Sequence, residues 1–173
     1  QRNWINKLSG INVDFTLTDG SKLPAFTTRI DTIFGVTAVV LAPEHPFCRK
    51  ICETDPTSTV SRFIQSTYKR SLVDRQSMQR NGVDTGFKCC HPITGEEIPV
   101  FVGDYVMGDI GTGTVMCVPA HDERDFEFAK NVGIPVKIVI KKEVGVEEQP
   151  YTQDGILINS ANFSGLKSND ARE

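Results

Sequence analysis

The sequence predicts an α/β domain centred on a β-barrel-like sheet, and three observations lead to this class. Short segments with strand character dominate, and about three segments have helical character. A Gly-Thr-Gly turn at residues 111–113 leads into a short apolar strand, Pro119 and a helix that opens on acidic residues. The 173 residues contain no internal repeat or low-complexity tract, so a single domain over residues 1–173 is expected.

The first half of the chain begins with a predicted hairpin. Residues 11–17 alternate apolar and polar side chains, residues 18–21 form a turn, and residues 22–28 return as a strand. Pro24 indicates an edge strand or a bulge in that return. An apolar, β-rich segment follows at residues 33–41. Helices are predicted at residues 47–53, 57–71 and 72–80.

The second half is predicted to contain short strands around one helix. The expected strands are residues 86–90 and 97–102, a buried strand with Val115 and Cys117, and residues 136–140 and 151–158. The helix covers residues 122–131, with Asp122 as an N-cap candidate and Gly133 as its C-terminal stop. Residues 141–149 are expected to form a loop, and residues 159–173 a polar exit.

Composition excludes several classes of function. No run reaches transmembrane length and no basic apolar leader is present, so we expect a soluble protein of the cytoplasm or an organelle. The net charge of −3 argues against long duplex nucleic acid but permits a short single-stranded end. The basic group Lys69, Arg70, Arg75 and Arg80 is either a solvated face or an RNA-backbone contact. Five cysteines with weak metal spacing indicate reduced, mostly buried thiols and no metal site.

Two segments carry side chains suited to chemistry. Residues 27–32, TTRIDT, place three hydroxyls beside Arg29 and Asp31, which either act on a ligand or form a structural ion pair. Asp122 and Asp125 lie on the first turn of the predicted helix, where they either cap it or receive a cation. His121 is either a base or structural. The serine-hydrolase elbow, the Walker loop and the dinucleotide fingerprint are absent from the sequence.

Four blocks together resemble the editing domain inserted into leucyl-tRNA synthetase. They are FTTRIDTIFGVT, APEHP, HPITGEEIPV and GTGTVMCVPAHDERDFEFA, in family order and over nearly the whole chain. The isoleucyl and valyl enzymes carry related domains with TTRPET-like motifs, in which a glutamate stands where this chain has Asp31. The late block is similar to leucyl enzymes of bacterial or organellar type.

The resemblance implies a β-barrel-centred α/β editing domain of a class I synthetase, with residues 1–10 and 159–173 leading to the rest of that enzyme. It implies hydrolysis of isoleucine, norvaline or methionine-like amino acids wrongly esterified to tRNA(Leu). A synthetic pocket separates such amino acids only ~10–200-fold, so a second sieve is needed. The implied partners are the tRNA 3′ end and the remaining synthetase chain, in a monomer without membrane contact. No cofactor is implied here, since ATP and Mg²⁺ belong to the synthetic domain, whose HIGH and KMSKS signatures are absent.

The resemblance also implies roles for individual residues. Thr27, Thr28 and Asp125 are the catalytic candidates: the hydroxyls orient ester and water, and the carboxylate holds the α-ammonium. Thr32 is implied to exclude leucine by its bulk, and the other candidates for the specificity pocket are Arg29, Asp31, Met116 and Val118. The candidates for terminal adenosine and ester are Met107, Gly111, Thr112, Gly113, His121 and Asp122.

Two departures from the family pattern concern the walls of the site. Ile30 stands where many relatives have proline, and Ile110 where bacterial relatives often have tyrosine. Two alternatives remain open: a valyl or isoleucyl editing domain, and a non-catalytic module that binds an RNA 3′ end.

Overall fold

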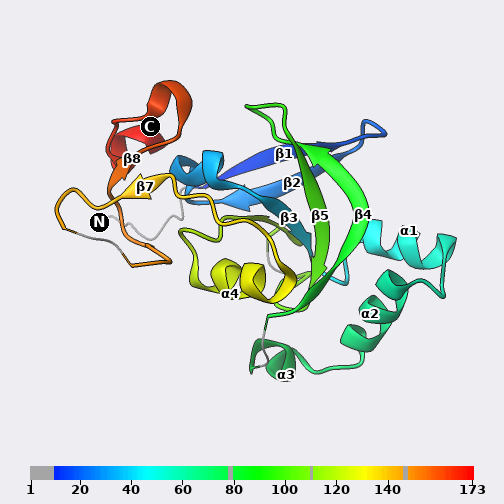
Figure 1. The fold of residues 1–173 in the computed structure, drawn as a ribbon. Coiled ribbons are helices and arrows are strands. Elements are labelled where there is room, and N and C mark those ends of the chain that lie inside the picture. Colours follow the sequence, from blue (N-terminus) through cyan, green and yellow to red (C-terminus); the bar gives the residue numbers. More distant parts are fainter. Residues whose placement is uncertain (1–9, 78–79, 110, 146–147) are drawn as a thin grey trace, which may run out of the picture.

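A curled six-stranded sheet forms the centre of the computed structural model, which describes residues 10–77, 80–109, 111–145 and 148–173 (Figure 1). The strand order is β2-β1-β4-β5-β3-β6. The strands are β1 (Ile11–Leu17), β2 (Lys22–Thr27), β3 (Ala38–Leu41), β4 (Gly82–Cys90), β5 (Glu97–Gly103) and β6 (Thr114–Cys117). Neighbours pair antiparallel, except that β3 and β5 are parallel.

The edge strands β2 and β6 lie side by side, which gives the sheet its barrel-like curvature. No ladder of the described residues joins them, so the hydrogen-bonded sheet stays open at this seam. The predicted α/β class is confirmed, while closure of a barrel is not part of the described pairing. Pro24 lies in β2 opposite Asp14, on the edge strand where a missing N–H is tolerated, as predicted.

The helices surround this sheet. The described residues contain five α-helices, of which the first four match segments predicted to be helical and the last does not: α1 (Pro46–Thr54), α2 (Thr59–Tyr68), α3 (Leu72–Ser77), α4 (Glu123–Val132) and α5 (Ser168–Arg172). Helices α1 and α2 lie beside β4 and α3 lies below them, whereas α4 lies on the opposite side of the sheet (Figure 1). Two 3₁₀ segments, η1 (Ile30–Gly35) and η2 (Ala161–Phe163), complete the helical parts. The predictions for residues 1–9 and 78–79 concern positions outside the described residues.

Three predicted strands form only in part, and side-chain hydrogen bonds explain the first two differences. The first part of residues 33–41 is η1, because the Thr32 hydroxyl and backbone N–H both donate to the Arg29 carbonyl and close a tight turn. Residues 136–140 are mostly irregular, because a ring nitrogen of His121 accepts the N–H groups of Val139 and Ile140. Only the short strands β7 (Ile140–Lys141) and β8 (Ile156–Leu157) form there, so the predicted strand at 151–158 also shrinks.

Neither interpretation of the basic group fits Arg75. Its side chain is 2% exposed and forms an ion pair with Glu44. Its Nε and Nη2 donate to the carbonyls of Asp104 and Val106 at 3.1 and 2.9 Å. Arg75 therefore fixes α3 to the segment that follows β5, and presents no charge to solvent or RNA.

The apolar interior lies on both faces of the sheet. Val39, Val100 and Val102 are fully buried on one face, and Phe128 of α4 packs on Phe101 at a ring-centroid distance of 5.7 Å on the other. All five cysteines are free thiols, and burial raises the pKa of Cys48 and Cys89 to about 12. The expected burial holds for Cys48, Cys89 and Cys117, whereas Cys52 is partly exposed and Cys90 is exposed.

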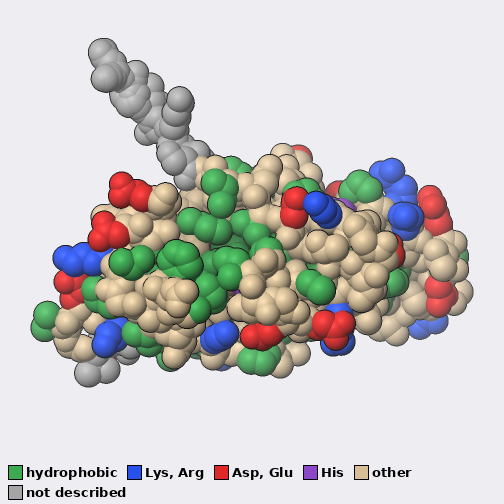
Figure 2. All heavy atoms as spheres, turned by 90° about the horizontal axis from the view of Figure 1, so that it is seen from above, with side chains coloured by type: hydrophobic (Ala, Val, Ile, Leu, Met, Phe, Trp, Pro, Cys, Tyr) green, Lys and Arg blue, Asp and Glu red, His purple; other side chains and the backbone are tan. Residues whose placement is uncertain are grey.

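The outer surface is mixed in character. Hydrophobic side chains gather across the middle of the face shown in Figure 2, and charged side chains lie mainly toward its two ends. Ile93, Phe163 and Leu166 are among the exposed large hydrophobic residues. Of the helices that the structure describes, none has the length and apolar character needed to cross a membrane.

Candidate functional site

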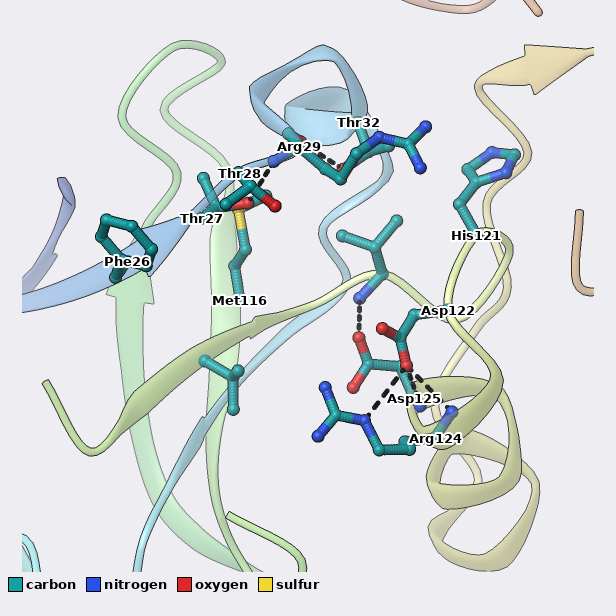
Figure 3. Close-up of a pocket in the computed structure, with 12 residues that line it drawn as sticks. Phe26, Thr27, Thr28, Arg29, Thr32, Met116, His121, Asp122, Arg124 and Asp125 are labelled. Atoms are coloured by element: carbon teal, nitrogen blue, oxygen red, sulfur yellow. Dashed lines mark hydrogen bonds and ion pairs between the residues drawn. The ribbon is translucent and has the colours of Figure 1, made fainter. Parts of the chain in front are cut away.

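A cavity of about 220 Å³ lies at the seam between β2 and β6, and we call it the polar cavity (Figure 3). Its wall combines the end of β2, the turn that follows, β6, and the N-terminus of α4. The lining residues are Phe26, Thr27, Thr28, Arg29, Thr32, Val115, Met116, Val118, His121, Asp122, Arg124 and Asp125. The fold thus brings together two segments that lie about 90 positions apart in the sequence.

The threonines enter the polar cavity from the end of β2 and from η1. Thr27 Oγ1 accepts the backbone N–H of Arg29 at 2.9 Å, which leaves its own proton available to a ligand. Thr28 is exposed. Thr32 is 2% exposed, and its hydroxyl donates to the Arg29 carbonyl at 2.7 Å. Because that hydroxyl is already bonded, Thr32 contributes steric bulk to the wall of the cavity more than a hydrogen bond to a ligand.

Arg29 and Asp31 form the ion pair considered as a structural alternative. Nε and Nη2 of Arg29 donate to the two carboxylate oxygens of Asp31, each at 3.1 Å. Arg172 of α5 approaches the same carboxylate at 3.2 Å. Asp31 is buried and does not line the polar cavity. It affects the site only indirectly, by holding Arg29 and the turn in place.

Asp122 caps α4, as the sequence predicts. Its backbone is extended, with φ −144° and ψ 129°, and Oδ1 accepts the N–H groups of Arg124 and Asp125 at 2.9 and 3.1 Å. Gly133 ends the helix in the left-handed conformation at φ 83°. The cap holds the first turn of α4 against the polar cavity.

Asp125 does not act as a capping-box partner. Its Oδ2 accepts the backbone N–H of Val118 at 3.0 Å, and its Oδ1 accepts the hydroxyl of Tyr105 at 2.8 Å. The residue is only 5% exposed, although it lines the cavity. Capping therefore explains Asp122 and leaves Asp125 for another purpose.

Burial, and after it the nearby charge of Asp122, raise the pKa of the Asp125 carboxyl to about 7 in total. The hydrogen bonds from Val118 and Tyr105, together with the charge of Arg124, oppose this rise. A carboxyl balanced in this way becomes fully ionised when a cation enters the cavity beside it.

His121 lines the polar cavity with both ring nitrogens engaged by the backbone. Nε2 accepts the N–H groups of Val139 and Ile140 at 3.0 and 3.1 Å, so Nδ1 carries the proton and donates to the Tyr151 carbonyl at 2.7 Å. This arrangement favours the structural alternative over a base. His91 and His45 also bond backbone groups, at the β4–β5 turn and at the N-terminus of α1.

A second cavity of about 150 Å³ adjoins the first, and we call it the neighbouring cavity. It shares Phe26, Val115 and Arg124 with the polar cavity. Its other lining residues are Tyr105, Val106, Met107, Gly111, Thr112 and Thr114. Gly111 has φ 61°, a conformation that glycine adopts without strain, and this turn shapes the wall.

The candidate residues from the sequence divide between these two cavities. Nine line the polar cavity: Thr27, Thr28, Arg29, Thr32, Met116, Val118, His121, Asp122 and Asp125. Met107, Gly111 and Thr112 line the neighbouring cavity, and Gly113 lines neither, although its carbonyl accepts the N–H of Ala42 at 2.8 Å. Ile110 lies outside the described residues.

Six residues that line these cavities were not among the candidates from the sequence, and they include Val106 and Thr114 of the neighbouring cavity. Phe26, Val115 and Arg124 line both cavities, and Tyr105 bonds Asp125. Phe26 alternates with buried Ala25 in β2, and Arg124 stands between the two aspartates, so both carried a usable signal. Nothing in the sequence around Tyr105 marks it. Among the described residues, no set of three or more His, Cys, Asp or Glu side chains could hold a metal ion.

Comparison with known proteins assigns this arrangement to a family. The sequence model described as "Leucyl-tRNA synthetase, editing domain" matches residues 2–173. The leucine–tRNA ligase of Clostridium tetani is 47% identical over 175 residues, which cover 99% of this chain and 21% of the relative. The leucine–tRNA ligase of Hydrogenovibrio crunogenus is 42% identical over 182 residues, covering 99% of this chain and 20% of the relative.

A solved structure shows the same fold. It is the ternary complex of Agrobacterium radiobacter K84 agnB2 LeuRS with tRNA and LeuAMS, with a TM-score of 0.72 and 33% identity. The match covers 95% of this chain and 18% of that one. The chain therefore spans about a fifth of the length of the relatives that it matches.

Proposed function

Since this chain belongs to the family of leucyl-tRNA synthetase editing domains, we propose that it hydrolyses wrongly formed aminoacyl esters on the 3′ end of leucine tRNA. One observation carries the proposal: the threonine hydroxyls and the acidic N-terminus of α4 line the same small cavity (Figure 3). Its volume of about 220 Å³ lies below the ~300–1,000 Å³ of sites for drug-sized ligands. An aminoacyl group suits a site of this size.

Each side of the polar cavity suits one part of an aminoacyl ester. The carboxylates of Asp122 and Asp125 attract the α-ammonium, and the hydroxyls of Thr27 and Thr28 donate toward the ester carbonyl oxygen. Water attacks the carbonyl carbon, the bond to the ribose oxygen breaks, and the amino acid and the terminal hydroxyl are released. Hydroxyls placed to stabilise the developing oxyanion contribute about 2.7–4 kcal/mol each in known sites.

The nucleoside of the substrate fits the neighbouring cavity. Phe26, Val115 and Arg124 form walls of both cavities, so one ligand can occupy them together. The turn that contains Gly111 and Thr112 offers backbone groups to the sugar and base, and Met107 offers an apolar surface.

Selection against the correct product is assigned to Thr32. Its buried position and occupied hydroxyl present a fixed wall to the aminoacyl side chain. Isoleucine, norvaline and methionine-like side chains are the proposed substrates, and leucine is the side chain that the wall rejects. The relatives are leucine–tRNA ligases, and this chain covers about a fifth of their length. We therefore assign tRNA affinity and the binding of ATP and Mg²⁺ to the remainder of such an enzyme. We propose that this enzyme acts as a monomer.

Ester hydrolysis separates this proposal from a module that only binds an RNA end. Isoleucyl-tRNA(Leu) is incubated with wild-type protein and with Asp125→Asn, which keeps the shape of the side chain and removes its charge. We expect wild-type protein to release isoleucine well above the background rate, and the variant to lose about 100-fold in kcat/KM.

The matched control is Glu123→Gln, which removes an exposed charge from the same helical turn outside both cavities. This variant should retain wild-type activity. Release at the background rate by wild-type protein and both variants would leave only RNA binding. Faster release of valine from tRNA(Ile) or threonine from tRNA(Val) would assign the domain to a sibling enzyme.

A further inference from the structure

The carboxylate of Asp125 is held by a phenol that the proposed hydrolysis does not use. Tyr105 follows β5, is 7% exposed, and donates its hydroxyl to Oδ1 of Asp125 at 2.8 Å. Its ring packs on Phe128, which lies in α4 like Asp125, and the two ring centroids are 5.2 Å apart. Tyr105 also lines the neighbouring cavity, so one side chain touches the group that faces the ester and the space assigned to the nucleoside.

The backbone on either side of Tyr105 is clamped by one guanidinium. Arg75 donates to the carbonyls of Asp104 and Val106, the residues directly before and after the tyrosine. The N–H of Asn81 donates to the Asp104 side chain at 3.0 Å. The phenol is therefore delivered to Asp125 from a rigid support rather than from a free loop.

We propose that Tyr105 is a positioning residue, which fixes the plane of the Asp125 carboxylate and keeps it charged so that it can receive the substrate cation. That this cation is an α-ammonium rests on the proposed function. The phenol and the Val118 N–H each occupy one acceptor position on different oxygens. Each oxygen keeps a second lone pair, and fixing the plane of the carboxylate fixes the direction of those lone pairs.

The charges around Asp125 make this phenol important. Asp122 of the same helix opposes ionisation, whereas Arg124 favours it. Cys117 of β6 and Tyr105 itself contribute no charge near neutral pH, because burial raises the pKa of both groups well above their ordinary values. Across the cavity stand Arg29, engaged by Asp31, and His121, engaged by three backbone groups. The Tyr105 hydrogen bond is thus one of few contacts that stabilise the ionised carboxylate.

The test removes one oxygen atom, with Tyr105→Phe. In an NMR titration, the Val118 amide reports the ionisation of Asp125 directly, because that amide donates to Oδ2. The hydrogen bond from the phenol stabilises the ionised carboxylate more than the neutral carboxyl, so the midpoint should rise by about one pH unit. The acid limb of kcat/KM for isoleucyl-tRNA(Leu) should move by the same amount. That shift means about fivefold lower kcat/KM at pH 7, mainly through KM, and recovery to within about twofold at pH 8.5.

Tyr151→Phe is the matched control, since that phenol donates to the Asp154 carbonyl at 2.7 Å and not to Asp125. It should leave the midpoint and the acid limb where they are. An unchanged Val118 midpoint in Tyr105→Phe would overturn the proposal, and so would an equal loss of activity at every pH. If wild-type protein shows no hydrolysis, the proposed function fails, and the amide titration still decides whether Tyr105 sets the ionisation of Asp125.

Discussion

Several single residues of the site have one polar group bound to the backbone and another part turned to the cavity. Thr27 accepts an N–H and keeps a proton to donate, while Thr32 donates its proton and keeps its methyl group. Two residues of the same type, five positions apart, therefore offer a ligand opposite properties. Motif spacing alone does not distinguish them, because the difference arises from which backbone group each hydroxyl meets.

The division between hydroxyl and methyl at Thr32 gives a sharp prediction. Thr32→Ser keeps the bond to the Arg29 carbonyl and loses the methyl group, whereas Thr32→Val keeps the bulk and loses the bond. We expect Thr32→Ser to cleave correct leucyl-tRNA(Leu) at least about tenfold faster than wild-type protein. Thr32→Val should spare it. Rates of leucine release from purified leucyl-tRNA(Leu) decide, and equal sparing by both variants would remove the gatekeeper role.

The buried carboxyl of Asp125 predicts an unusual dependence of stability on pH. An ordinary aspartate titrates near 3.8 and this one near 7, so between these values the folded protein holds a proton that the unfolded chain releases. The free energy of unfolding should therefore fall as pH rises from about 4 to 7, and this contribution should be level above 7.

Asp125→Asn removes that dependence. Measured by urea unfolding, the stability of the variant relative to wild-type protein should increase between pH 4.5 and pH 8, by at most about 4 kcal/mol. Glu123→Gln, at an exposed position of the same turn, should show no such trend. A relative stability of Asp125→Asn that stays constant over this range would contradict the buried, neutralised carboxyl.

Among the elements, α4 and β6 form the corner that carries the acidic half of the site. The strand ends at Cys117, Val118 donates to Asp125, and Asp122 caps the helix. Sequence patterns predicted this corner well, since caps, a C-terminal glycine and a short apolar strand are local signals. They did not predict the support behind it, because Arg75 lies 30 positions before Tyr105 and joins it only in three dimensions.

Loss of that support should be costly. Arg75→Met leaves the buried carbonyls of Asp104 and Val106 without their donor, and we expect about 3 kcal/mol less free energy of unfolding. Lys22→Met is the control, because Lys22 and Asp14 are both exposed and lie 3.9 Å apart, an interaction of less than about 1 kcal/mol. Urea unfolding of both variants measures the difference, and equal losses would show that the clamp is unimportant.

Across the whole molecule, the C-terminal helix and the threonine turn are tied through one buried carboxylate. Arg172 of α5 and Arg29 both bind Asp31, next to Thr32 in the chain. Arg172→Gln should speed hydrogen exchange of the amides in residues 30–35 and lower kcat/KM for isoleucyl-tRNA(Leu) several-fold. Lys167→Gln, which removes an exposed pair at 3.9 Å, should change neither. An unaltered exchange rate in Arg172→Gln would show that α5 does not stabilise the threonine turn.

Some elements of this fold could be predicted from the sequence much better than others, and the reason is physical. Alternation and caps located β1, β2, α1 and α4 closely, because those signals act within a few residues. The composition of residues 136–140 predicts a strand. In the structure, however, the His121 ring accepts the N–H groups that would otherwise donate to a neighbouring strand. The cavity at the seam of β2 and β6 depends on the curvature of six strands, which no local pattern encodes.

The most direct test of the shared cavity is a crystal structure with an adenosine that carries norvaline through a 3′ amide in place of the ester. The ammonium should lie about 2.7–2.9 Å from a carboxylate oxygen of Asp125, with the acyl carbonyl at Thr27 and Thr28. The adenine should occupy the neighbouring cavity. A ligand bound elsewhere, or one whose ammonium faces solvent away from α4, would contradict the proofreading role.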